Sequence, residues 1–258
     1  MTPFAVFPPE RLRRVRFVLT DVDDTLTVGA RLPAATYDAL ERLAAAGLTV
    51  VPVTAAPSGW CDVMARMWPV AAVIGENGGL CFRYRPERGA ADRHYWLPAA
   101  EREPARQRLL ELAAGIAAAV PQSRLAPDQR YRETTLAFAR DGGDAAAILA
   151  RLAAAGARTA VNSLWVLGWF GDFDKLAMAR RILRELFALD LAADADAVLY
   201  VGDSPNDEPM FGFFENSVGV ATVAHHLDRL AAPPKWVTRG GGGTGFVEIA
   251  DALIAARE

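Results

Sequence analysis

The segment Val15-Arg16-Phe17-Val18-Leu19-Thr20-Asp21-Val22-Asp23-Asp24-Thr25 begins with apolar and β-branched residues and ends in three acids and a threonine. Such a run is typical of a strand that is buried on both faces of a parallel sheet. In open α/β sheets, ligands bind just beyond the carboxyl ends of the strands. Asp21 and Asp23 are therefore candidate site residues, and an acidic turn that caps the next element is the alternative. An EF-hand calcium loop is excluded, because Leu26 and Leu32 stand where that loop requires glycine and glutamate.

The composition is that of a globular protein. The chain has 258 residues, of which 52% are hydrophobic and 23% are charged. This length suits one large domain or a domain with an insertion. The formal net charge of −3 gives no support for a surface that binds nucleic acid or an anionic membrane. No apolar run approaches the ~20 residues of a membrane span.

The amino-terminal region and the cysteines both favour a cytoplasmic location. Residues 1–16 include Pro3, Pro8 and Pro9 and lack an apolar stretch followed by a cleavage site, so we expect no signal peptide. Cys61 and Cys81 both have apolar neighbours in the sequence. Reduced thiols in the core are therefore favoured over a disulfide.

Strand and helix patterns alternate through the first third of the chain. After the first strand, a helix is predicted at 33–46, with proline in its first turn and Gly47 at its end. A strand at 48–53 ends in Thr54, and a helix at 57–68, a strand at 70–74, a turn at 76–79 and a strand at 80–84 follow. This order predicts an α/β fold with a doubly wound, Rossmann-like parallel sheet.

The alternation of strand and helix patterns stops in the middle of the chain and resumes after Gly171. A polar connection at 85–92, helices at 103–120 and 144–155, and a hairpin that turns near Asn162 and Ser163 predict an inserted α+β domain. We therefore assign residues 1–83 and 171–258 to the core and 84–170 to the insertion. The glycine run at 240–243 is read as a flexible loop, in preference to a phosphate cradle, since no P-loop lysine follows it.

Polar residues stand at the ends of three predicted strands, namely Asp21 and Asp23, then Thr54, then Asp203 and Asp207. In one parallel sheet these strand ends share an edge, so the side chains could converge. Carboxylates packed together repel each other unless a cation neutralises them. Carboxylate oxygens without cysteine or histidine favour Mg²⁺, which is often completed by a substrate phosphate.

A hydroxyl and a positive charge could complete such a phosphate site. Thr54 at a strand end and Lys175 at the start of a predicted helix could contact phosphate oxygens. Taken alone, a lysine at the start of a helix is more often simply solvated. The three polar strand ends and Lys175 indicate a phosphate site only because they occur together.

Together, these features resemble the haloacid dehalogenase-like (HAD) superfamily of phosphohydrolases, over essentially the whole chain. Asp21-Val22-Asp23-Asp24-Thr25 matches its first motif, DxDx[TV], and Thr54 and Lys175 match the second and third. Gly202-Asp203-Ser204-Pro205-Asn206-Asp207 matches the fourth motif, GDSxND. The insertion lies between the second and third motifs, where the family has its C2-type cap. With the Glu76-Asn77-Gly78 turn, the chain is most similar to the IIB branch, which includes Cof-like and sugar-phosphate phosphatases.

The resemblance implies catalytic and metal-binding roles. Asp21 would be the nucleophile that forms an aspartyl-phosphate. Asp23 would protonate the leaving oxygen and then activate water. Asp21, the backbone carbonyl of Asp23, and Asp203 would hold Mg²⁺, with Asp207 as a direct or water-mediated ligand.

The resemblance also implies a phosphate site and two departures from the family pattern. Thr54 and Lys175 would bind the phosphoryl group, and Asn206 would help to hold it or orient Lys175. Many relatives have Thr-Gly-Arg at the second motif, but Ala55 and Ala56 follow Thr54 here, so the arginine contact is missing or comes from another residue. Asp24 stands where glycine is common.

The substrate contacts implied for the insertion are less specific. Arg130 and Arg132 could recognise a second anionic group, although a solvated face is the commoner arrangement. Trp165 could stack on a sugar, although aromatic residues in a hairpin are more often core.

A Mg²⁺-dependent phosphatase of a small phosphorylated metabolite, with sugar phosphates first, is the leading prediction. A phosphomutase and a non-catalytic sugar-phosphate-binding protein are the alternatives, and the intact pair of Asp21 and Asp23 argues against the second. The expected partner is the small-molecule substrate, with the chain as a monomer or homodimer.

Overall fold

The computed structural model describes residues 1–141, 143–162 and 164–258. Its core is a six-stranded parallel sheet in the order β1-β12-β11-β10-β2-β3, which confirms the predicted doubly wound α/β fold. The strands are β1 (Thr2–Pro3), β2 (Phe17–Thr20), β3 (Thr49–Pro52), β10 (Val198–Gly202), β11 (Ser217–Gly219) and β12 (Trp236–Val237).

The alternation of side chains along β2 explains why both faces of the sheet are covered. Val18 packs in the apolar cluster shared with helices α2 (Ala34–Ala45) and α9 (Gly242–Ala255). Leu19 packs in the opposite cluster, shared with α6 (Lys175–Phe187) and α8 (Glu208–Phe213). Successive side chains of a strand point to opposite faces, so a strand buried on both sides needs a helical layer on each. The remaining core helices are α1 (Pro9–Arg14), α3 (Ser58–Met67) and α7 (Leu191–Asp194).

A second, antiparallel sheet continues from the core and changes the expected boundary of the insertion. It consists of β4 (Val73–Gly75), β5 (Leu80–Arg85) and β6 (Ala90–Tyr95), and β4 adjoins β3 through a parallel bridge between Val53 and Ile74. The segment 85–92, expected to be a polar connection, is a hairpin that turns at Pro86–Arg88. We therefore propose that the inserted domain begins after Tyr95 rather than at residue 84.

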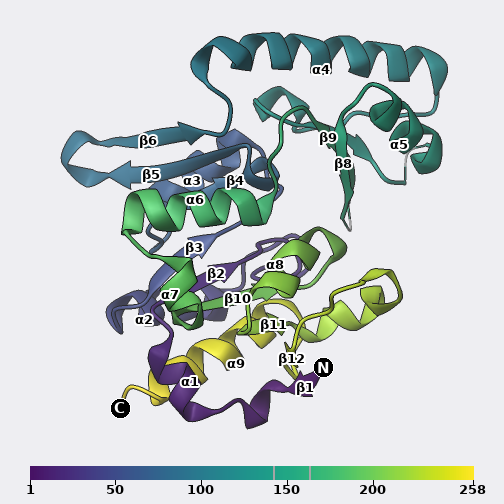
Figure 1. The fold of residues 1–258 in the computed structure, drawn as a ribbon. Helices are drawn as coiled ribbons and strands as arrows, with labels where there is room; N and C mark the ends of the chain where they lie inside the picture. The colour runs from purple at the N-terminus through teal and green to yellow at the C-terminus, as the bar shows by residue number, and fades with distance from the viewer. Residues whose placement is uncertain (142, 163) are drawn as a thin grey trace.

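The inserted domain contains α4 (Ala99–Ala119), β7 (Leu136–Ala139), α5 (Ala145–Ala154), β8 (Arg158–Val161) and β9 (Trp165–Trp169). Its three strands form an antiparallel sheet in the order β7-β9-β8. The β8–β9 hairpin agrees with the sequence, but Ser163, named for its turn, lies outside the described residues. In Figure 1 this domain lies above the core, and β8 descends to contact the turn Pro205–Asp207.

The glycine run at 240–243 is not the flexible loop that we expected. Gly242 and Gly243 are buried in the first turn of α9. A Cβ atom on Gly243 would lie 2.1 Å from the Thr36 hydroxyl oxygen, so a side chain there would prevent the approach of α9 to α2. Gly242 also has a φ of +52°, a left-handed conformation that favours glycine. The run therefore serves close packing.

Two further expectations concern the cysteines and the membrane. Cys61 and Cys81 are buried and unpaired, as predicted. In the part of the chain that the structure describes, no helix combines the length and the apolar character that crossing a membrane requires.

Candidate active site

The predicted polar residues meet at one edge of the parallel sheet. β2 lies between β10 and β3. Asp21 follows β2, Thr54 follows β3, and Asp203 follows β10, and all three side chains are buried. Because the strands are parallel, their carboxyl ends face the same crevice. The sequence prediction that these strand ends converge therefore agrees with the geometry.

Lys175 enters this edge from the first turn of α6. The helix starts there because the Asp174 carboxylate accepts a hydrogen bond from the backbone N–H of Ala177, at 2.7 Å. The side chain of Lys175 is only 1% exposed, and its Nζ lies 2.7 Å from Asp21 Oδ1 and 2.6 Å from Asp207 Oδ1. Burial lowers the pKa of Lys175, but the carboxylates of Asp207 and Asp21 outweigh it and raise the pKa above its ordinary value. The ammonium group is therefore held charged between two carboxylates.

Asp207 has all of its acceptor positions occupied. Its Oδ1 accepts hydrogen bonds from Lys175 Nζ and the Tyr200 hydroxyl. Its Oδ2 accepts from the backbone N–H groups of Asp203 and Ser204, at 3.0 and 3.1 Å. A carboxylate offers about four lone-pair sites, so these four donors leave little capacity for a direct metal bond. Asp207 is thus arranged to hold Lys175.

Three carboxylates gather tightly enough to hold a cation. Asp21, Asp203 and Asp207 each place an oxygen within 4.8 Å of the others. Burial raises the pKa of Asp21 to about 8, with Lys175 opposing the shift and Asp207 adding to it. Burial raises the pKa of Asp203 to about 9, and the charges of Asp21 and Asp207 add to this shift. Such a cluster ionises readily only when a cation neutralises it, and hard oxygen donors suit Mg²⁺.

Asp23 is not part of the cluster formed by Asp21, Asp203 and Asp207. It is half-buried, and burial, followed by the charge of Asp24, raises its pKa. It lines a cavity of about 310 Å³ that also contains Ala55, Arg132 and Trp165. Asp24 has a φ of 55°. This left-handed conformation costs a side chain about 1–2 kcal/mol and glycine almost nothing.

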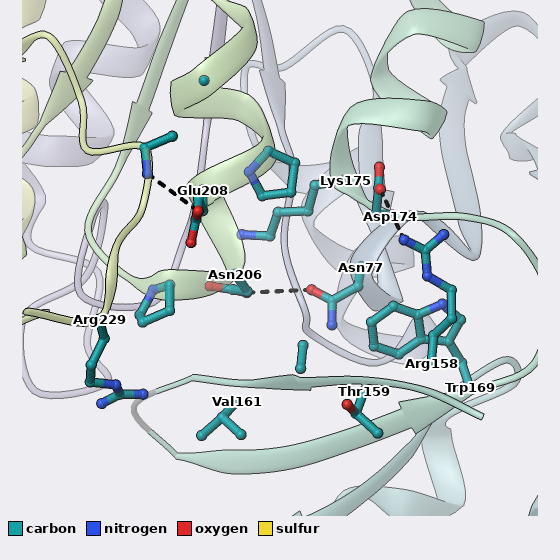
Figure 2. Close-up of a pocket in the computed structure, with 15 residues that line it drawn as sticks. Asn77, Arg158, Thr159, Val161, Trp169, Asp174, Lys175, Asn206, Glu208 and Arg229 are labelled. Carbon is teal, nitrogen blue, oxygen red and sulfur yellow. Dashed lines mark hydrogen bonds and ion pairs between the residues drawn. The ribbon is translucent and has the colours of Figure 1, made fainter. Parts of the chain in front are cut away.

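A second, larger cavity reaches Lys175 from the side of the inserted domain. Its volume is about 650 Å³, and Lys175, Asn206 and Asn77 line one wall (Figure 2). Asn206 Nδ2 donates to Asn77 Oδ1 at 3.4 Å. Asn77 is 2% exposed, and its own Nδ2 has no partner among the described residues. Arg229 and Arg158 lie at the two sides of the view, and Arg158 is paired with Asp174 at 3.4 Å.

The three substrate residues predicted in the insertion have different surroundings. Arg132 is buried, donates to both oxygens of Asp128 and to the Ala55 carbonyl at 2.9 Å, and so lies against the second motif. Arg130 is exposed, with its guanidinium 4.8 Å from the centre of the Tyr131 ring. It lines neither of the two cavities. Trp165 lines the cavity that contains Asp23.

Sequence reasoning missed Tyr200, Glu76 and Asp128. Tyr200 is fully buried in an apolar strand, where its hydroxyl needs a partner, and strand alternation could have drawn attention to it. Glu76 belongs to the recognised turn, but five of its six hydrogen bonds come from residues 57–59 positions away. The pairing of Asp128 with Arg132 is an i,i+4 pattern outside any predicted helix, so the sequence offered no reason to expect it.

Comparisons with known proteins address the fold. No protein-family model matches the chain, and no curated protein matches it significantly. Among solved structures, Thermoplasma acidophilum 0175 matches with a TM-score of 0.73 and 21% identity, over 93% of this chain and 98% of that chain. The sucrose-phosphatase of Synechocystis sp. PCC6803, solved with sucrose and phosphate, matches with a TM-score of 0.67 and 14% identity, over 93% and 98%. A putative HAD/COF-like hydrolase from Plasmodium vivax matches with a TM-score of 0.66 and 14% identity, over 96% and 99%. These matches confirm the HAD-like fold suggested by the sequence.

Proposed function

We propose that the chain is a Mg²⁺-dependent phosphatase that hydrolyses a small phosphorylated metabolite, with sugar phosphates as the first class to test. The observation that carries this proposal is the buried Lys175, held between Asp21 and Asp207 beside Asp203 at the carboxyl ends of central strands. The fold shared with a sucrose-phosphatase supports the choice of sugar phosphates.

Asp21 and Asp23 divide the chemistry between them. Lys175 holds one oxygen of Asp21, and the other attacks phosphorus, forming an aspartyl-phosphate while the bond to the alcohol oxygen breaks. Asp23 gives its proton to that oxygen and then takes a proton from the water that hydrolyses the aspartyl-phosphate. Burial raises the pKa of Asp23 above its ordinary value, which favours the protonated form that a general acid requires.

Two positive charges, Mg²⁺ and Lys175, would offset the negative charge of the phosphoryl group. Mg²⁺, held by Asp21, Asp203 and the backbone carbonyl of Asp23, would supply positive charge to the phosphoryl oxygens. Asp207 keeps Lys175 in place through the four-donor arrangement. In this role Asp207 would contact the metal through water rather than directly.

The remaining contacts to the phosphoryl group come from neutral side chains. Thr54 Oγ1 accepts a hydrogen bond from the backbone N–H of Ala56 at 3.0 Å, so its own proton is available for a phosphoryl oxygen. Asn206 is oriented by the Ser204 hydroxyl at 2.6 Å and lines the same cavity as Lys175. Fixed donors of this kind stabilise a transferring phosphoryl group without reorganising during the reaction.

A panel of phosphate monoesters, assayed with Mg²⁺ and with a chelator, tests this proposal. We expect release of inorganic phosphate from at least one sugar phosphate, and loss of that release on removal of the metal. Transfer of the phosphoryl group to a second sugar hydroxyl without release would instead identify a mutase. Binding without either reaction would contradict the proposal.

A further inference from the structure

The two cavities beside the catalytic carboxylates differ in chemistry. The Lys175 cavity, about 650 Å³ in volume, has the N–H donors of Asn77, Asn206 and Arg158 on its walls (Figure 2). The Asp23 cavity, about 310 Å³ in volume, lies between the core and the inserted domain and is lined mostly by apolar side chains. The substrate alcohol and the phosphoryl oxygens could therefore bind in different cavities.

The position of Asp23 decides where the alcohol binds. A general acid must lie within hydrogen-bonding distance, roughly 2.6–3.2 Å, of the oxygen that it protonates. Asp23 lines the smaller cavity and does not line the larger one. The alcohol is therefore expected in the Asp23 cavity, while the Lys175 cavity remains for phosphoryl oxygens and water.

Three tryptophans line the Asp23 cavity. Trp60 comes from α3, Trp68 follows that helix, and Trp165 starts β9 of the inserted domain. Trp60 is 59% exposed, so covering its apolar ring would be favourable. Indole faces pack well on the faces of other rings. A ring in this cavity would cover apolar surface contributed by both the core and the insertion.

Among the described residues that line the cavity, none offers a free positive charge to a second anionic group. Of the described residues that line it, Arg132 is the one cation. Its guanidinium is occupied by both oxygens of Asp128, by the Ala55 carbonyl and by the Thr135 hydroxyl. Asp128 adds negative charge at the same walls. An additional carboxylate or phosphate on the alcohol would be desolvated there without a partner, which is strongly unfavourable.

The volume limits the size of the group. At about 310 Å³, the cavity is at the lower end of the range of roughly 300–1,000 Å³ found for ligand pockets, so it suits a small alcohol such as one substituted ring.

From these observations we infer that the substrate is a monophosphate of a single, uncharged ring alcohol, whose ring packs against Trp60 and Trp165 beside Asp23. This inference rests on the proposed function, because it takes Asp23 as the acid. It excludes bisphosphates and phosphorylated acids as preferred substrates, and it replaces the earlier expectation that Arg132 recognises a second anionic group.

Binding to the Asp21→Asn protein tests the inference without turnover. Calorimetry in Mg²⁺ should compare benzyl phosphate with 4-carboxybenzyl phosphate, and glucose 1-phosphate with glucuronic acid 1-phosphate. We expect the uncharged member of each pair to bind at least about tenfold more tightly, because the charged one is desolvated without a cation. Equal affinities within both pairs, or no binding of any of the four, would overturn the inference.

Three variants and one control test whether the Asp23 cavity is responsible for the preference for uncharged esters. Trp60→Ala and Trp165→Ala should each weaken benzyl phosphate about fivefold or more, through lost ring contacts, and leave inorganic phosphate binding unchanged. Met67→Ala is the matched control, since Met67 is exposed on α3 and outside the cavity. Asp128→Asn should release the Arg132 guanidinium and reduce the preference for the uncharged ester to about threefold or less.

Failure of the inference can be told apart from failure of the proposed function. If the wild-type protein with Mg²⁺ releases phosphate equally well from benzyl and 4-carboxybenzyl phosphate, the function stands and the inference is wrong. If it hydrolyses none of the four esters but Asp21→Asn binds the uncharged ones preferentially, the cavity assignment stands and the phosphatase proposal is in doubt.

Discussion

The Glu76 carboxylate joins the core to the inserted domain, and its replacement provides a quantitative test of the fold. Glu76 is fully buried, and six hydrogen bonds reach it. Oε1 accepts from the backbone N–H groups of Ser58 at 3.1 Å and Glu133 at 2.8 Å. Oε2 accepts from the backbone N–H and the hydroxyl of both Thr134 and Thr135, at 2.7–2.9 Å.

Glu76→Gln preserves the shape of the side chain but replaces one acceptor with an N–H₂ donor. In the better orientation, the amide oxygen takes the place of Oε2, and the amide nitrogen faces the N–H groups of Ser58 and Glu133. Each buried donor left without an acceptor costs about 1–3 kcal/mol, so we expect a loss of about 2–6 kcal/mol. For a protein of this size each kcal/mol lowers Tm by about 2–4 °C, which gives a decrease of at least about 4 °C.

Thermal unfolding followed by circular dichroism at pH 7 measures this change. Glu185→Gln is the matched control, because Glu185 is a partly exposed acid on α6 whose partners are surface arginines, and such pairs contribute about 0–1 kcal/mol. If Glu76→Gln lowers Tm no more than the control does, the five hydrogen bonds from Glu133, Thr134 and Thr135 do not hold the insertion to the core as described.

Three further predictions concern the site. Asp23→Asn should lower kcat for an alkyl phosphate by about 10²–10⁴-fold and for 4-nitrophenyl phosphate much less, because only the alkoxide needs a proton; equal losses would contradict its role as acid. Tyr200→Phe should remove one donor from Asp207 and lower the free energy of unfolding by about 1.5–3 kcal/mol, measured in urea. The raised pKa values of Asp21, about 8, and Asp203, about 9, mean that the metal-free folded protein binds more protons than the unfolded chain. Its free energy of unfolding should therefore fall as pH rises from about 4 to about 9, so Mg²⁺ should raise Tm more at pH 8 than at pH 5.

The core of the fold could be predicted because its signals are local. The apolar run before Asp21 has few alternatives to a buried strand, and the acids mark its carboxyl end. Once Thr54 and Asp203 are placed at the ends of neighbouring parallel strands, their convergence follows from the geometry of the sheet. Helix α6 then brings Lys175 to the same edge through its capped first turn.

Two contacts that the sequence did not reveal join partners distant in the chain. Glu76 and Thr135 are 59 positions apart, and Arg132 and the Ala55 carbonyl are 77 apart. Hydrophobic periodicity indicates which side of a segment is buried, but it does not indicate which polar groups form hydrogen bonds there. The strand β6 was predicted only at its end, where a strand at 94–97 was expected, for a related reason. Its residues Ala90–Tyr95 are largely polar and only partly buried, so their pattern indicates a connection, and pairing with β5 makes them a strand.

Phosphate release by the wild-type and Asp21→Asn proteins tests the central proposal most directly. Asparagine is nearly isosteric with aspartate, and a circular dichroism spectrum matching that of the wild type would establish that the variant is folded. With a sugar phosphate and Mg²⁺, we expect the wild-type protein to release inorganic phosphate and the variant to be at least about a thousandfold slower. A folded Asp21→Asn protein that releases phosphate at the wild-type rate would contradict the assignment of Asp21 as the nucleophile.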